Sequence, residues 1–180
     1  NNFFFLKATT LFSPVPLKCD TATNTVITYP QMLGETIAST GPLSVQMFAT
    51  GRLVEQSLMV NVKGKGLVVI IGCGHPQIET IIKTAEALTG TPVYAVAGGA
   101  HLYFTDVQDK FWRNLFGSSK PFCRSLTKQE VIATANFVQN SGVRKVYLSP
   151  HDSDEATQKI FAKAYGKNYE TIQIGKQISF

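Results

Sequence analysis

The spacing of apolar residues predicts that strands and helices alternate through most of the chain. Residues 57–62 alternate apolar and polar side chains, residues 67–72 are continuously apolar, and the Lys-Gly-Lys-Gly of 63–66 suits a hairpin turn between them. The alternating strand can leave one face in water, whereas the continuously apolar strand needs cover on both faces. The part of the chain before this hairpin holds short apolar pieces among Thr, Ser, Gly and Pro, which predicts short strands and turns.

The pattern changes to a helical period directly after the second strand of this hairpin. Apolar residues recur on one stripe of a helix over residues 76–89, where Pro76 suits the first helical position and Gly90 a helix stop. Residues 92–99 form the next apolar strand. The order strand, helix, strand predicts a parallel pair joined by a right-handed crossover.

The C-terminal part repeats this alternation. Thr127 and Glu130 match a capping box, with Leu126 placed as a hydrophobic staple, so we expect a helix over residues 128–140. A strand at 143–150, a helix at 154–165 and one or two strands at 170–180 follow, which gives an α/β fold class. The intervening segment, 103–125, is irregular, and a loop of this length in a compact domain is usually functional or faces a partner.

Composition narrows the class of protein. The 180 residues are 44% hydrophobic and 16% charged, as expected of a globular domain, and no apolar run reaches the ~18 residues that span a bilayer. The aromatic N-terminal run lacks the basic region of a signal peptide, so we expect no membrane partner. A net charge of +5 from scattered lysines and arginines favours an anionic small-molecule substrate over nucleic acid.

Cysteine usage says little about redox chemistry or compartment. The sequence has three widely spaced cysteines, Cys19, Cys73 and Cys123, and this odd number does not indicate a disulfide framework. A single disulfide between Cys19 and Cys123 is an open alternative. This usage leaves the compartment unknown, with a lean to a reducing one such as the cytoplasm.

The three histidines of the sequence, His75, His101 and His151, each come shortly after a predicted strand. If those strands are parallel, all three histidines lie at the carboxyl edge of the sheet, where ligand sites of open α/β sheets form. Imidazoles are frequent metal ligands and general bases, which predicts a common site. Each histidine could instead only make hydrogen bonds in its own loop.

Two neighbours of these histidines widen the alternatives. Cys73 is a buried small hydrophobe, a soft metal ligand, or a nucleophile with His101 as its base. Asp152, beside His151, could orient an imidazole or cap the helix that follows. No asparagine or aspartate is evidently placed to orient a catalytic base, so the residues favour a metal over a nucleophile.

Three motifs together resemble a known family. Gly-Cys-Gly-His (72–75), VYAVAGGAHL (93–102) and Pro-His (150–151) resemble, in this order, the C-terminal half of metallo-β-lactamase-fold hydrolases. The chain looks most like the dihydropterin-aminobenzene-phosphate synthase-like branch, with its GCSH or GCAH, VYAVIGGFHL and PxHCTG motifs. The resemblance covers about residues 25 to 180. It departs where Asp-Ser follows the last histidine in place of Cys-Thr, and where alanine precedes His101 in place of an aromatic residue.

The resemblance implies an αββα sandwich, to which this chain contributes a mixed sheet with helices on one face. It also implies one or two zinc, iron or manganese ions and a metal-activated water that attacks an anionic or phosphorylated small molecule. His75 and His101 are then candidate metal ligands, and Cys73 falls at a ligand position. His151, with Asp152 beside it, is a further ligand or a substrate contact.

The His-x-His-x-Asp-His motif of the family's N-terminal half is absent from the sequence. We therefore expect residues 1–180 to be a single, incomplete domain with little or no activity alone. A longer parent chain or a second polypeptide would supply the missing half. Alternatively, the protein is a degenerate, non-catalytic relative that serves as an interaction or sensing module. Because the helices cover one face of the sheet, the other face would bind the missing half, or a second copy in a homo-oligomer.

Overall fold

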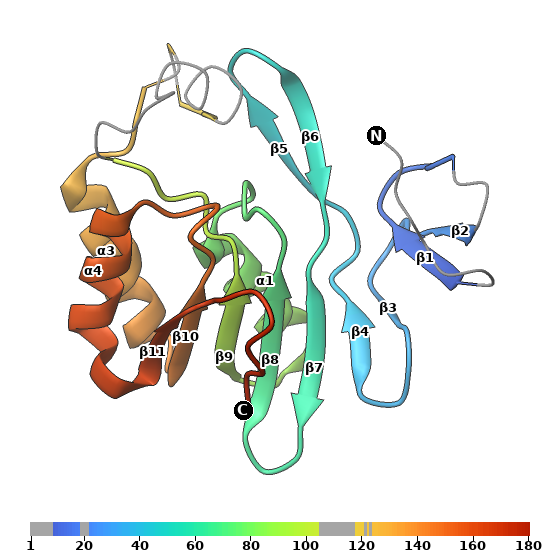
Figure 1. Ribbon diagram of the computed structural model, residues 1–180. Helices are drawn as coiled ribbons and strands as arrows, with labels where there is room; N and C mark the ends of the chain where they lie inside the picture. Colours follow the sequence, from blue (N-terminus) through green and yellow to red (C-terminus); the bar gives the residue numbers. More distant parts are fainter. Residues whose placement is uncertain (1–8, 19–21, 105–117, 121, 123) are drawn as a thin grey trace.

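The computed structural model describes residues 9–18, 22–104, 118–120, 122 and 124–180. Within these residues a seven-stranded mixed sheet has the strand order β11-β10-β9-β8-β7-β4-β3 (Figure 1). Four adjacent strands are parallel: β8 (Gly66–Ile71), β9 (Val93–Gly98), β10 (Lys145–Leu148) and β11 (Tyr169–Thr171). The antiparallel strands β7 (Leu58–Val62), β4 (Ile37–Ser39) and β3 (Gln31–Met32) complete it.

Two small sheets lie beside the main one. Strands β1 (Thr9–Ser13) and β2 (Ala22–Val26) pair in parallel, and β5 (Leu43–Met47) and β6 (Gly51–Glu55) form an antiparallel hairpin. The hairpin stands beyond the carboxyl ends of β8 and β9, and β6 continues directly toward β7 (Figure 1). The predicted β7–β8 hairpin and the predicted parallel pairing of β8 with β9 are both confirmed.

The described residues contain three α-helices, close to the predicted positions. Helix α3 (Lys128–Asn140) begins at the predicted residue, and Thr127 and Glu130 form both hydrogen bonds of the capping box. Helix α1 (Ile78–Thr89) begins later than the predicted Pro76 because Gln77 has a φ of 74°, outside the helical region.

Helix α4 (Glu155–Tyr165) corrects one prediction. Its N-cap is Asp154, whose carboxylate accepts a hydrogen bond from the Thr157 N–H at 2.8 Å. Of the two roles considered for Asp152, the capping of this helix is therefore wrong. A 3-10 turn (Gly166–Asn168) connects α4 to β11, which is shorter than the predicted terminal strands.

The hydrophobic core forms between the helices and one face of the sheet. Leu67, Val69 and Ile71 alternate along β8 onto this face and are at most 5% exposed. They pack in one cluster with the buried residues of the three helices, among them Ile78, Ile82, Val131, Val138 and Phe161. This arrangement gives the α/β class that the alternating pattern predicted.

The C-terminal segment crosses the opposite face of the sheet. Figure 1 shows it passing in front of β9 and β8, and the Phe180 ring packs edge-on against Tyr147 with centroids 5.4 Å apart. The Lys65 ammonium donates to the Phe180 carbonyl oxygen at 2.6 Å. The cover is incomplete, since Ile70 of β8 remains 42% exposed and Ile37 of β4 remains 37% exposed. The expectation that β8 is covered on both faces is thus met only in part.

Several sequence-based expectations lie outside the described residues. They concern Cys19, Cys123 and most of the 103–125 loop. Among the residues that the structure describes, no helix is both long enough and apolar enough to cross a membrane.

Candidate metal centre

Two glycine-rich turns meet at the carboxyl edge of the parallel strands. Residues 72–75 follow β8, and residues 99–101 follow β9, which itself ends at Gly98. The Gly99 N–H donates to the Gly72 carbonyl oxygen at 2.8 Å. A Cβ atom at Gly99 would lie 2.3 Å from that oxygen and 2.6 Å from the Cys73 carbonyl oxygen. A residue with a side chain therefore cannot occupy position 99 without moving one of the turns.

This contact brings two of the three histidines together. The His75 and His101 rings lie with their centroids 4.1 Å apart and their planes at 31°, and the Tyr103 ring meets His101 edge-on at 5.5 Å. His151 is exposed, and its carbonyl oxygen accepts a hydrogen bond from the Tyr103 hydroxyl. Because β8, β9 and β10 are parallel, the prediction that the three histidines follow strands at one edge of the sheet is confirmed, and the ring contact joins His75 and His101.

Glu55, at the end of β6, is the residue that sequence reasoning missed. One of its carboxylate oxygens pairs with His75 Nδ1, and the other accepts from the Gly74 N–H at 3.1 Å. The side chains of Glu55 and His75 are only 16% and 13% exposed. Burial alone would raise the pKa of Glu55, but the hydrogen bond and charge of His75 outweigh it and the pKa lies below its ordinary value. The carboxylate is therefore ionised at neutral pH.

Cys73 lies half-buried beside two carboxylates. Burial, followed by the charges of Asp152 and Glu55, raises the pKa of the Cys73 thiol to about 11. Burial also raises the pKa of Asp152, whose side chain is hydrogen-bonded with Cys73. Without a metal the sulfur is thus a protonated thiol at neutral pH, which argues against a free thiolate nucleophile.

The donor set fits a divalent metal ion. Among the described residues, the ligand atoms of Glu55, Cys73 and His75 all lie within 4.8 Å of one another. Carboxylate oxygen, thiolate sulfur and imidazole nitrogen are ligand types that zinc and iron accept in proteins. A bound cation would also favour deprotonation of the Cys73 thiol, which burial and the nearby carboxylates keep protonated. His101 stacks beside this group of three, which includes neither His151 nor Asp152.

A pocket of about 420 Å³ opens beside this group. His75, His101 and Tyr103 line one part of it, and Lys120 and Arg124 line another. Its size is in the range of small-molecule sites. Two of the candidate ligands, His75 and His101, are therefore placed where a bound small molecule could reach them.

Comparisons with known proteins bear on this geometry. No protein-family model matches the chain. The chain is 26% identical over 117 residues to the 7,8-dihydropterin-6-methyl-4-(β-D-ribofuranosyl)-aminobenzene-5'-phosphate synthase of Methanocaldococcus jannaschii. The match covers 64% of this chain and 32% of the synthase, so it spans about a third of the length of this curated relative.

The chain matches two solved structures, among others, and the first of them shares the fold. Tm1679, a metal-dependent hydrolase of the β-lactamase superfamily, matches with a TM-score of 0.65 and 20% identity, over 89% of this chain and 60% of its own. An NDM_FIM-1 like metallo-β-lactamase from Erythrobacter litoralis in its mono-zinc form matches 68% of this chain and 44% of its own, with a TM-score of 0.36 and 14% identity. The sequence similarity to the synthase and the fold shared with Tm1679 confirm the resemblance that the motifs indicated: the chain has the fold of the metallo-β-lactamase superfamily of metal-dependent hydrolases.

Proposed function

We propose that this protein is part of a metal-dependent hydrolase and that Glu55, Cys73 and His75 hold the metal. The observation that carries the proposal is the convergence of three different ligand types within 4.8 Å, beside a pocket of small-molecule size. Zinc, iron and manganese are the candidate ions. His101 is a further candidate ligand because its ring lies against that of His75.

Glu55 has two compatible roles at such a site. It can bind the ion directly, or it can hold His75 through Nδ1 and leave Nε2 as the ligand atom of the ring. In the second role the carboxylate fixes the tautomer and orientation of the imidazole, as outer partners of metal-bound histidines commonly do. A divalent ion, when bound, polarises a carbonyl or phosphoryl oxygen and lowers the pKa of a bound water.

The substrate class we propose is an anionic or phosphorylated small molecule. The net charge of +5 supports it, and the name of the matched synthase refers to an aminobenzene-5'-phosphate compound. His101 and Tyr103, on the wall of the pocket, would contact the substrate near its reacting bond. The role of His151 and Asp152 as a further ligand or a substrate contact stays a prediction.

The incomplete cover of one face of the sheet supports the proposal that a partner binds there. Ile70 and Ile37 are large apolar side chains on one face of β8 and β4, and about two fifths of each is exposed. We propose that the N-terminal half of an αββα sandwich covers them, contributed by a longer chain or a second polypeptide, or else that a second copy does so. The N-terminal half would also bring the His-x-His-x-Asp-His ligands that this sequence lacks, whereas a second copy would only cover the apolar face.

Metal analysis tests the proposed function. The protein made from its complete gene is supplemented with Zn²⁺, Fe²⁺ or Mn²⁺, desalted and analysed for metal content. We expect about one or two ions per molecule, fewer in Cys73→Ser and His75→Ala, and hydrolysis of phosphoesters that a chelator removes. A protein that retains no ion after supplementation would overturn the proposal. Activity that survives the chelator but not Cys73→Ser would instead support cysteine chemistry.

A further inference from the structure

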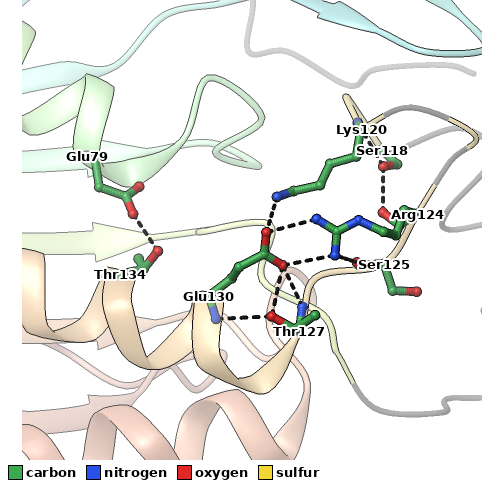
Figure 2. Close-up of polar contacts among 8 residues, drawn as sticks. All are labelled: Glu79, Ser118, Lys120, Arg124, Ser125, Thr127, Glu130 and Thr134. Carbon is green, nitrogen blue, oxygen red and sulfur yellow. Dashed lines mark hydrogen bonds and ion pairs between the residues drawn. The ribbon is translucent and has the colours of Figure 1, made fainter.

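Two cations on the pocket wall converge on a single carboxylate. Lys120 and Arg124 come from the segment before α3, and Glu130 comes from the first turn of that helix (Figure 2). The Lys120 ammonium pairs with Glu130 Oε1, and the Arg124 guanidinium donates to the same oxygen at 2.9 Å. All three side chains line the pocket that reaches His75 and His101.

Glu130 fixes the position of both cations relative to the helix. Its Oε2 accepts from the Thr127 N–H at 2.8 Å and from the Thr127 hydroxyl at 3.0 Å, so the carboxylate is anchored at the N-terminus of α3. The cations are therefore held to a rigid element although they lie in an irregular segment. Such pre-organisation lowers the entropic cost of binding a ligand.

The cluster keeps an excess of positive charge. One carboxylate neutralises only one of the two cations, and the N-terminus of α3 adds a partial positive charge. Lys83, which lies over the Phe137 ring at 4.9 Å, also lines the pocket, as does the carboxylate of Glu79. The pocket thus has three cations against two carboxylates.

Donors remain for a second anion. An ammonium has three N–H donors and a guanidinium has five. Among the described residues, the hydrogen bonds of the Lys120 and Arg124 side chains go to Glu130 and, at 3.3 Å, to the Ser125 carbonyl oxygen. The side chains of Lys120 and Arg124 are 25% and 51% exposed, so a ligand can reach them. A guanidinium fork matches the geometry of phosphate and carboxylate.

We propose that Lys120 and Arg124 form an anion subsite of this pocket, which binds an oxyanion group of the substrate. Glu130 is the positioning residue that aligns the two cations. This inference rests on the proposed function, which places the reacting bond of the substrate near His75 and His101, in the other part of the pocket. It predicts a substrate with two parts, a hydrolysable bond and a phosphate or carboxylate group away from that bond.

Binding of inorganic phosphate to chelator-treated protein tests the subsite without using activity. We expect Lys120→Ala and Arg124→Ala each to raise the phosphate Kd about tenfold, because each removes a charge-assisted contact. Matched controls are Lys159→Ala and Arg144→Ala, which remove the same charges at exposed positions that do not line the pocket. Both controls should bind phosphate as the unmodified protein does, and circular dichroism verifies that every variant is folded.

Benzoate, measured in the same way, distinguishes the two oxyanions. Tighter binding of phosphate than of benzoate identifies a phosphate subsite, and the reverse order identifies a carboxylate subsite. The proposal is overturned if the unmodified protein shows no saturable binding of either anion, or if both pocket variants bind them as tightly as the controls do. Metal content is measured separately, so a failed subsite with metal retained leaves the proposed function standing, and the converse result leaves the subsite standing.

Discussion

Replacing Gly99 with alanine should disrupt the contact between the two turns that carry His75 and His101. The added Cβ would lie 2.3 Å from the Gly72 carbonyl oxygen, 2.6 Å from the Cys73 carbonyl oxygen and 2.7 Å from Asp152 Oδ2. Two of these atoms belong to the backbone, so a change of side-chain rotamer cannot relieve the overlap. The turns must move apart, and the hydrogen bond from the Gly99 N–H is lost with them.

The expected cost is at the upper end of the 1–3 kcal/mol that overpacking commonly takes from the free energy of unfolding, or about 3 kcal/mol. Urea denaturation followed by circular dichroism measures it. Gly72→Ala is the matched control, because a Cβ there meets nothing within 4 Å and the φ of Gly72 is not left-handed. This control should stay within about 0.5 kcal/mol of the unmodified protein. Equal stability of the two variants would refute the claimed close approach of the turns.

Three further predictions concern the cap of α3 and the metal centre. Thr127→Ala should lower the free energy of unfolding by about 1 kcal/mol, since it removes the N-cap acceptor, and an unchanged urea midpoint would contradict this. The Arg124 guanidinium and the Lys120 ammonium hold the pKa of Glu130 well below its usual range, so this group stabilises the fold above pH ~4.5 and loses that effect as the pH falls. Thermal melts should therefore show a larger loss of Tm between about pH 6 and pH 3 for the unmodified protein than for Glu130→Gln, which keeps a capping side chain. Equal losses in the two proteins would count against a stabilising role of the ionised Glu130. Glu55→Gln should weaken metal binding about 10- to 100-fold in a competition titration with a chromophoric chelator. An unchanged metal affinity would show that Glu55 does not contribute to the metal site.

Local sequence signals were sufficient to predict helix ends that depend on a few neighbouring residues. The capping box at Thr127 and the glycine stop at Gly90 predicted the start of α3 and the end of α1 because each depends on a few neighbouring residues. The start of α1 was missed because nothing about glutamine as a residue type signals the positive φ of Gln77. The cover of the sheet by the C-terminal segment also depends on contacts between residues far apart in the sequence.

Glu55 shows most clearly what pattern alone leaves undecided. The sequence predicted the hairpin of β7 and β8, and in the structure Leu58 pairs with Ile70. Carrying this antiparallel register back along β7 places Glu55 opposite Cys73, in the turn that contains two candidate ligands. The signal was therefore present, but it depends on the register of the hairpin, and a slip of one residue would turn every side chain of the strand to the other face. Because the 63–66 turn is compatible with neighbouring registers, the position of a carboxylate beside Cys73 and His75 follows only from the three-dimensional structure.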